Sequence, residues 1–310
     1  MKEERKDAIR VDGVNKDYGQ GRGNFGVSFS VKEGEAFGIV GENGAGKTTL
    51  LRQVMGFIKP DSGKIGIYGF DAYEDSALTK PYIGYIPGEI NFPDVRSGNE
   101  FLHNYGTAMG MKEGDFAYAD ELISRMQLDV RAYPKRMSKG MKQKTSIVAA
   151  MMLKSPILIM DEPSIGLDPL MREELLTLIL EQKQRGATIL MTSNTIEELE
   201  RVCDKVAYMS AGKIIDVADV QEIKNRPCRD YKIGFESKKD YLCFSKRRKD
   251  ILRVQPSFNQ VTVRVKKQDI PKLLDELEKS KVAYLSEVKY NLTTYFTEKR
   301  KQQALGGEMK

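Results

Sequence analysis

The residue pattern with the clearest chemistry lies in a glycine-rich segment, residues 41–49. Its members are Gly41, Glu42, Asn43, Gly44, Ala45, Gly46, Lys47, Thr48 and Thr49, and the first eight match the Walker A pattern G-x-x-x-x-G-K-[ST]. The glycines allow successive backbone N–H groups to turn inward around a phosphate. In such a loop the lysine reaches the β- and γ-phosphates of a nucleotide, and the hydroxyl after it binds Mg²⁺. The segment therefore predicts a nucleoside triphosphate site, with Lys47 and Thr48 in these two roles.

The segments on either side supply the elements that such a loop needs. Residues 36–40 are apolar enough for a buried strand, and residues 48–55 contain no Gly or Pro and predict a helix. The N-terminus of that helix would add its positive dipole end to the phosphate site. A glycine-rich connector is the alternative reading, and the strand and helix argue against it.

A second pattern with catalytic chemistry ends an apolar run at residues 157–160. Asp161 and Glu162 follow that run directly, as in a Walker B strand. Asp161 would hold Mg²⁺, usually through water, and Glu162 would polarise the attacking water. By itself, an apolar strand that ends in acidic residues is a common structural event.

A third pattern, residues 137–144, stands upstream of that strand. It reads Met-Ser-Lys-Gly-Met-Lys-Gln-Lys, with Ser138 where a helix N-cap would lie. A hydroxyl, backbone N–H groups and a helix N-terminus together form an anion site. An ordinary capped helix is the alternative.

The order of these patterns resembles that of ABC transporter ATP-binding proteins over roughly residues 9–217. Residues 137–144 resemble the signature L-S-G-G-Q of that family, where Ser138 and Gly140 match and Lys139 and Met141 depart. Residues 164–168, Ser-Ile-Gly-Leu-Asp, resemble its D-loop and end in Asp168. The resemblance implies an α/β fold: a P-loop NTPase core of ABC ATPase type, with an antiparallel β edge and a helical subdomain.

The same resemblance implies a mechanism. Two domains face each other head to tail, and each ATP binds the Walker motifs of one copy and the signature of the other. ATP closes the pair and hydrolysis separates it, which is a ligand-driven population shift. Tyr18 lies where the family has an aromatic residue that stacks on adenine, and a core or turn tyrosine is the alternative. ATP and Mg²⁺ are the expected cofactors.

Two positions depart from the family pattern. Gly88 stands where the Q-loop glutamine is expected, and Glu89, a further oxygen ligand for a metal or its water, follows it. Asn194 occupies the position where the family has its switch histidine. Asparagine can donate a hydrogen bond to a γ-phosphate oxygen, but it cannot carry a positive charge or relay a proton. Loss of one transition-state contact costs roughly 10²–10³ in rate, so we expect ATP binding to survive and hydrolysis to be slow.

Charge divides the chain near Gln221. Residues 221–310 contain 22 Lys and Arg against 12 Asp and Glu, a net charge of +10; the whole chain carries +6, so the first 220 residues carry −4. We expect an ATPase domain over residues 1–222 with a helical subdomain over about 88–150, a small α+β domain over 223–298 and a disordered tail over 299–310. The basic domain could face acidic lipid headgroups or nucleic acid, but a solvated lysine-rich surface is favoured.

The hydrophobic pattern predicts where these elements lie. Strands are expected at 8–14, 27–31, 188–192, 206–209 and 213–217, and helices at 99–109, 115–126, 138–153, 169–185 and 196–202. After residue 225 we expect strands at 231–235, 251–254, 261–265 and 282–288 and a helix at 270–279. Strands that alternate with helices predict a parallel sheet covered on both faces.

Composition limits the location of the chain. No apolar run approaches the roughly 20 residues that span a bilayer, and the charged N-terminus does not resemble a secretory signal. Three cysteines without C-x-x-C spacing indicate reduced thiols. We expect a cytoplasmic protein, peripheral on the inner face of the cell membrane.

The predicted function is therefore that of the ATP-hydrolysing subunit of a membrane transporter. Its partners would be a separate integral membrane permease, received by the helical region 88–150, and a second ATPase subunit, identical or related. The signature variant and the short α+β extension resemble the ABC-2 group of bacterial exporters. One alternative is an ATP-binding subunit with little hydrolysis. Another is a soluble ABC switch on ribosomes or DNA, but a second P-loop and sustained heptads are missing, so a nucleic-acid partner is not expected.

Overall fold

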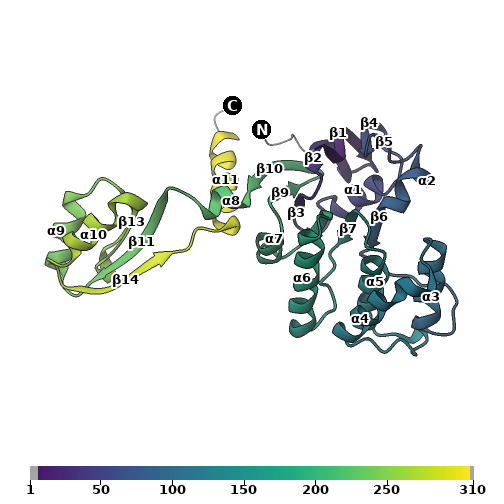
Figure 1. Cartoon of the computed structure of the whole chain (residues 1–310). Helices are drawn as coiled ribbons and strands as arrows, with labels where there is room; N and C mark the ends of the chain where they lie inside the picture. Colours follow the sequence, from purple (N-terminus) through teal and green to yellow (C-terminus); the bar gives the residue numbers. More distant parts are fainter. Residues whose placement is uncertain (1–5, 308–310) are drawn as a thin grey trace. The chain divides into compact units, whose positions relative to one another are not determined.

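The computed structural model describes residues 6–307 and divides into two compact units. The division falls between Asp219 and Val220, close to the change of charge at residue 221. Figure 1 shows the elements of both units along the chain. Each unit has its own hydrophobic core.

A six-stranded sheet in the order β10-β9-β3-β8-β7-β6 forms the centre of the first unit. Its strands are β3 (Ala36–Val40), β6 (Ile83–Ile86), β7 (Ile157–Asp161), β8 (Thr188–Ser193), β9 (Lys205–Ser210) and β10 (Lys213–Asp219). All neighbours are parallel except β10, which pairs antiparallel with β9. Every residue of β3, β7 and β8 is buried, as the apolar runs of a covered parallel sheet require. The predicted α/β core with an antiparallel edge is confirmed.

The parallel strands bring three functional segments to one edge of this sheet. Val40 of β3 pairs with Ser193 of β8, and Asp161 of β7 pairs with Thr192 of β8. The chain therefore leaves all three neighbouring strands at nearly the same level. Ligand sites of parallel sheets form at this carboxyl edge. Three helices begin near it: α1 (Lys47–Val54), α6 (Pro169–Gln184) and α7 (Ile196–Val202).

A second, antiparallel sheet of the order β2-β1-β4-β5 shares its core with the central sheet. Its strands are β1 (Asp7–Asp17), β2 (Gly23–Lys32), β4 (Ser62–Ile67) and β5 (Phe70–Asp71), and α2 (Ser76–Thr79) and η1 (Lys80–Tyr82) follow them. Buried Val11, Val14 and Val27 of this sheet belong to the same cluster as Phe37 and Ile39 of β3. The turn between β1 and β2 carries Tyr18.

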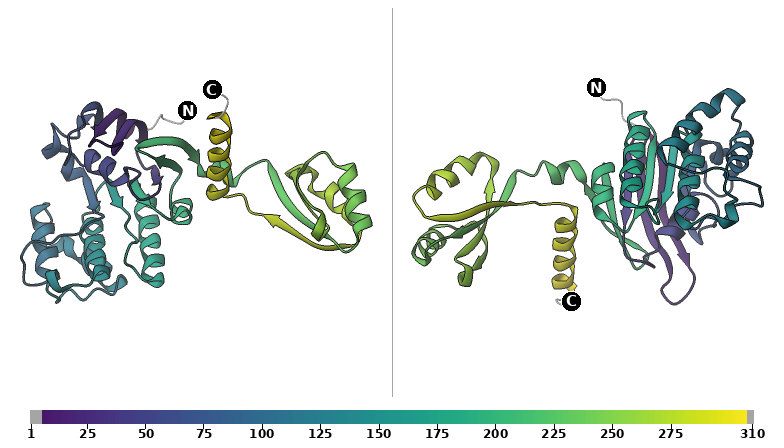
Figure 2. Two further views of the ribbon diagram at one scale, coloured as in Figure 1. Left: turned by 180° about the vertical axis from the view of Figure 1, so that it is seen from behind. Right: turned by 90° about the horizontal axis from the view of Figure 1, so that it is seen from below.

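A group of helices lies apart from the antiparallel sheet in Figure 1 and in the left view of Figure 2. It comprises α3 (Gly98–Ala108), η2 (Glu113–Phe116), α4 (Ala117–Arg125), η3 (Pro134–Arg136) and α5 (Lys139–Met152). Arg125 of α4 donates to Glu174 and Glu181 of α6 at 2.6 and 2.7 Å. This charged contact attaches the group to a helix of the core.

The second unit contains a four-stranded antiparallel sheet of the order β12-β13-β11-β14. Its elements are α8 (Val220–Lys224), β11 (Cys228–Phe235), α9 (Lys238–Arg247), β12 (Ile251–Gln255), η4 (Pro256–Phe258), β13 (Gln260–Lys266), η5 (Lys267–Asp269), α10 (Ile270–Leu277), β14 (Val282–Val288) and α11 (Leu292–Gly307). Tyr241 and Phe244 of α9 and Leu273 of α10 pack against Ile233 and Val263 of the sheet.

Helix α11 continues through residues 299–307, part of the segment 299–310 for which the sequence predicts a disordered tail. Leu292 and Phe296 in the first turns of α11 are buried, and their spacing of four residues places them on one helix face. The lysine, glutamine and alanine residues that follow are good helix formers. A helix anchored at its start therefore continues through them. Residues 308–310 lie outside the described residues.

Candidate nucleotide-binding site

The loop between β3 and α1 has the geometry of a phosphate cradle. Gly44 and Gly46 have φ angles of 82° and 102°, in the left-handed region that glycine adopts without strain. A Cβ atom on Gly46 would lie 2.7 Å from the carbonyl oxygen of Gly23. Helix α1 begins directly after Gly46, and its first turn holds no acidic residue. The helix N-terminus is thus free to attract an anion.

An open cavity of about 630 Å³ adjoins this loop. It is lined by Tyr18, Arg22, Gly23, Asn43, Gly44, Ala45, Gly46, Lys47, Thr48, Thr49, Gly88, Glu89, Asp161, Glu162 and Ile165. The volume suits a small-molecule ligand of a few hundred daltons. The Tyr18 side chain stands at the cavity with 54% of its surface exposed, so one ring face is available for stacking.

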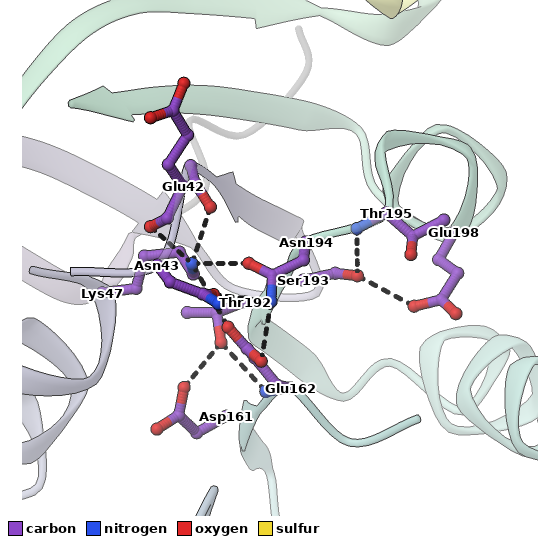
Figure 3. Close-up of polar contacts among 11 residues, drawn as sticks. Glu42, Asn43, Lys47, Asp161, Glu162, Thr192, Ser193, Asn194, Thr195 and Glu198 are labelled. Atoms are coloured by element: carbon purple, nitrogen blue, oxygen red, sulfur yellow. Dashed lines mark hydrogen bonds and ion pairs between the residues drawn. The ribbon is translucent and has the colours of Figure 1, made fainter. Parts of the chain in front are cut away.

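Lys47 connects the loop to the acidic end of β7. It is 4% exposed, and its Nζ donates to the carbonyl oxygen of Gly41 at 2.7 Å and to Oδ1 of Asn194 at 2.8 Å (Figure 3). The same Nζ lies 3.2 Å from Oε1 of Glu162. A phosphate group at the loop would compete with Glu162 for this ammonium group.

Asn194 completes the link between these groups. Its Nδ2 donates to Oε2 of Glu162 at 3.0 Å and to Oδ1 of Asn43 at 3.1 Å. The orientation of the amide follows from chemistry, because Lys47 can only donate and so requires the amide oxygen. The carboxylate of Glu162 then receives the NH₂ group. A neutral side chain therefore positions both a phosphate-binding cation and a candidate general base.

Asp161, the last residue of β7, and Glu162, which follows the strand, both contact one hydroxyl. Oγ1 of buried Thr192 donates to Oδ1 of Asp161 at 2.7 Å and accepts from the backbone N–H of Glu162 at 3.0 Å. Glu162 has a φ of 49°, a left-handed conformation that costs a non-glycine residue of order 1–3 kcal/mol. Such outliers collect at functional sites, where surrounding contacts hold them.

One carboxylate oxygen of Asp161 has no hydrogen-bond partner. This oxygen, Oδ2, is buried. Gly88 lies beside it, because a Cβ atom on Gly88 would be 2.8 Å from Oδ2. A buried, unpaired carboxylate oxygen is the donor that a hard divalent cation prefers. This oxygen therefore fits Mg²⁺ held together with nucleotide phosphates.

Comparison with known proteins agrees with this geometry. The family model for "ABC transporter" matches residues 25–165. The linearmycin resistance ATP-binding protein LnrL of Bacillus subtilis is 34% identical over 70% of this chain and 71% of its own length. The chain belongs to the ABC transporter ATP-binding proteins.

Further relatives and solved structures extend the comparison. The daunorubicin resistance ATP-binding protein DrrA3 of Streptomyces coeruleorubidus is 31% identical over 70% of each chain. A solved ATP-binding subunit of an ABC transporter is 30% identical, with a TM-score of 0.65 over 71% of this chain and 92% of its own. A dimeric ATP-binding cassette bound to ADP and Pi, 20% identical, has a TM-score of 0.62 over 68% and 98% and shares the fold. As a family member, this chain is an ABC-type ATPase that binds ATP.

Ser138 and Gly140 of the ABC signature and Asp168 of the D-loop lie outside the cavity, whereas Ile165 of the D-loop lines it. Ser138 caps α5 by accepting from the backbone N–H of Met141 at 3.2 Å, and Asp168 caps α6 by accepting from that of Met171 at 3.0 Å. The Met171 hydrogen bond lowers the pKa of the Asp168 carboxyl. Neither these caps nor Gly140 are among the cavity-lining residues. One copy of this ABC ATPase thus brings the Walker residues together and leaves the signature elsewhere.

Glu89, the third predicted metal ligand, lines the cavity, but its carboxylate pairs with the guanidinium group of Arg52. Its side chain is 83% exposed and lies 3.4 Å from the Arg52 guanidinium. Within residues 6–307, no three His, Cys, Asp or Glu side chains form a group that could hold a metal ion. The metal role of Glu89 stays a prediction.

Sequence reasoning missed several residues of the site. Arg22 and Gly23 line the cavity, and Nδ2 of buried Asn24 donates to the carbonyl oxygen of Gly46 at 3.1 Å. Their signal was the glycine-rich turn after residue 18, which predicts a loop without indicating what it faces. Thr192 was expected only as the end of a strand, although its position opposite Asp161 gives it two hydrogen bonds.

Proposed function

We propose that this chain is the ATP-hydrolysing subunit of a membrane exporter and that two such subunits close head to tail on Mg²⁺ and ATP. The single observation that carries the proposal is the group formed by Lys47, Asn194 and Glu162 beside the unpaired oxygen of Asp161. It unites a phosphate-binding cation, a base for water and a metal ligand at one edge of the sheet. Ser138 and Gly140 would complete the site from the other copy.

Each residue then has a defined task. The backbone N–H groups of residues 43–48 and Lys47 hold the β- and γ-phosphates, and Tyr18 stacks on the adenine. Thr48 and Asp161 would hold Mg²⁺, which neutralises charge on the phosphate oxygens when bound. Glu162, released from Lys47 by the incoming phosphate, accepts the proton of the attacking water. Asn194 donates to a phosphate oxygen or keeps Glu162 in place.

A second cavity supports docking of a permease. It has a volume of about 330 Å³, lies where the helical group meets the core, and has a largely apolar lining. Its aromatic residues are Phe57, Tyr85, Phe92, Phe101 and Tyr105. An apolar cleft of this size accepts a few large side chains from a short amphipathic helix. We assign it to the cytoplasmic segments of the permease.

The names of two relatives support a partnership with a separate membrane subunit. No helix among residues 6–307 is long and apolar enough to cross a bilayer. LnrL and DrrA3 are named for resistance to linearmycin and daunorubicin. Export of a toxic compound through a separate membrane subunit, with this chain peripheral on the inner face of the membrane, fits these names. The permease, rather than this chain, would select the compound.

Asn194 favours a second candidate, an ATP-binding subunit that closes on ATP but hydrolyses it slowly. One experiment separates the two: steady-state ATP hydrolysis by the chain reconstituted with its permease in liposomes, alongside dimer formation measured by light scattering. Rapid turnover, of roughly tens per second, supports the ATP-hydrolysing exporter subunit and refutes the slowly hydrolysing candidate. ATP-dependent dimers with turnover far below about one per second support the second candidate. Absence of ATP binding would refute both.

A further inference from the structure

One buried carboxylate joins three segments near the site without contacting the cavity. Glu198, in the first turn of α7, is 4% exposed. Its Oε2 accepts from the hydroxyl of Ser193 and from that of Ser164, both at 2.9 Å. Its Oε1 has no hydrogen bond and lies 3.5 Å from Nε of Arg172 in α6. Figure 3 shows Glu198 reaching toward Ser193 beside the network of Lys47 and Asn194.

The two serines belong to the loops that matter for catalysis. Ser193 directly precedes Asn194, and its hydroxyl also accepts from the backbone N–H of Thr195 at 2.9 Å. Because it donates to Glu198 and accepts from Thr195, this hydroxyl holds the loop of Asn194 in one conformation. Ser164 follows Glu162 by two residues and begins the D-loop, which ends at Asp168. The carboxylate therefore ties the two loops to one oxygen atom.

Burial of a carboxylate between two loops is unfavourable unless hydrogen bonds and an opposite charge compensate its desolvation. Hydrogen bonds from two hydroxyls to one carboxylate oxygen are charge-assisted and stronger than neutral ones. Arg172 belongs to the first turn of α6, directly after the D-loop, and supplies the compensating positive charge. Any shift of the D-loop is thus transmitted to Glu198 through both Ser164 and Arg172, and from Glu198 to Ser193.

We propose that Glu198 is a positioning residue that couples the D-loop to Asn194 and thereby sets the geometry of Lys47 and Glu162. This inference rests on the proposed function, since it assumes that hydrolysis occurs in the cavity beside Lys47. Glu198 is not among the residues that line the cavity. It fixes the rate of the chemical step through the placement of Asn194, and it leaves the affinity for ATP unchanged.

The test compares variants of the full chain in single-turnover hydrolysis of radiolabelled ATP, with ATP affinity measured separately by a fluorescent ATP analogue. Glu198→Ala removes the acceptor of both hydroxyls, and misplacement of a catalytic group by about 1 Å lowers the rate roughly 10²-fold. We expect the hydrolysis rate to fall by roughly 10- to 100-fold and the dissociation constant to stay within about twofold. Glu198→Gln keeps an oxygen for both hydroxyls and should restore most of the rate.

The control is Glu197→Gln, a neutralised carboxylate one position earlier on the same helix whose side chain is exposed. It should leave both quantities unchanged. A Glu198→Ala variant that is folded and hydrolyses ATP within about threefold of the wild-type rate overturns the inference, as does a parallel loss of affinity and rate. If Glu198→Ala does not fold, Ser164→Ala carries the test, since it deletes one donor. An unchanged rate in that variant has the same meaning.

The two proposals fail in distinguishable ways. Wild-type protein that binds no ATP refutes the proposed function, and this inference falls with it. Wild-type protein that hydrolyses ATP, with a Glu198→Ala variant of equal rate, refutes the inference and leaves the proposed function intact. Restoration of the rate by Glu198→Gln, at an unfolding temperature that differs little between the two variants, separates positioning from simple stabilisation.

Discussion

The hydroxyl of Thr192 makes the sharpest prediction, because one atom supports both acidic residues of the site. Thr192→Val keeps the shape of the side chain and removes that hydroxyl. Asp161, which is 1% exposed, then loses the donor that lies 2.7 Å from its Oδ1. The backbone N–H of Glu162 loses the oxygen at 3.0 Å but keeps the Thr192 carbonyl oxygen at 3.2 Å. One hydrogen bond is thus lost outright, and the other is weakened.

The expected loss of stability follows from these contacts. A hydrogen bond to a charged group contributes about 1.5–3 kcal/mol, and a partly replaced neutral one about 0.5–1 kcal/mol. The free energy of unfolding should therefore fall by about 2–4 kcal/mol. For a unit of about 200 residues this lowers the midpoint of thermal unfolding by roughly 5–15 °C, measurable by calorimetry. Hydrolysis should fall as well, because both acids lose their common support.

Thr192→Ser is the matched control. It keeps the hydroxyl and removes one buried methyl group, at a cost of about 1 kcal/mol. The valine variant should therefore be the less stable of the two and the less active. Equal or greater stability of Thr192→Val would refute the reasoning, because it would mean that the hydroxyl does not compensate the buried charge of Asp161.

Three further predictions concern the departures from the family and the cap of α6. Gly88→Ala places a methyl group about 2.8 Å from Oδ2 of Asp161. Mg²⁺-dependent hydrolysis should therefore fall about 10-fold, while metal-free ATP binding is retained. Titrations with and without EDTA would show both effects. Asn194→His supplies a side chain that can carry charge and should raise turnover at least about 10-fold in a steady-state assay; an unchanged rate contradicts the argument. The backbone N–H of Met171 donates to Asp168 and lowers the pKa of its carboxyl in the folded state. The resulting stabilisation is therefore complete above the unfolded-state pKa of about 3.9, and it is lost as the pH falls through the folded-state pKa. Asp168→Asn should therefore flatten the pH dependence of unfolding below about pH 4, as acid titration of the unfolding midpoint would show.

Much of the fold could be predicted because its signals are local. The apolar run before Asp161 predicts a buried strand, and the Asp168-Pro169 pair predicts the start of a helix; both occur as expected. Helix α9 was missed because its buried Tyr241 and Phe244 stand among lysine residues, and this hides the periodicity. Short helices of such composition form because a neighbouring sheet buries their apolar side chains.

Contacts between distant segments could not be predicted in the same way. Thr192 meets Asp161 only because β8 lies beside β7 in a particular register, and the order of strands is not written in a local pattern. The same holds for Glu198, which reaches Ser164 at a separation of 34 residues. Motif residues reveal which groups do the chemistry. The residues that hold them in place have ordinary types and are found only when the chain is folded.

The two departures from the family pattern act on different parts of the site. Gly88 adjoins the unpaired oxygen of Asp161 and so affects the metal, whereas Asn194 contacts Lys47 and Glu162 and so affects the phosphate and the water. A glutamine at position 88 would have to occupy space that the buried Asp161 carboxylate already fills. Because Asn194 is neutral, it adds no charge to the Lys47–Glu162 pair and does not repel Lys47 when phosphate replaces the carboxylate. An intact phosphate loop can therefore occur together with altered catalytic residues. The loop depends on backbone geometry, whereas catalysis depends on the replacement of Glu162 by phosphate at Lys47.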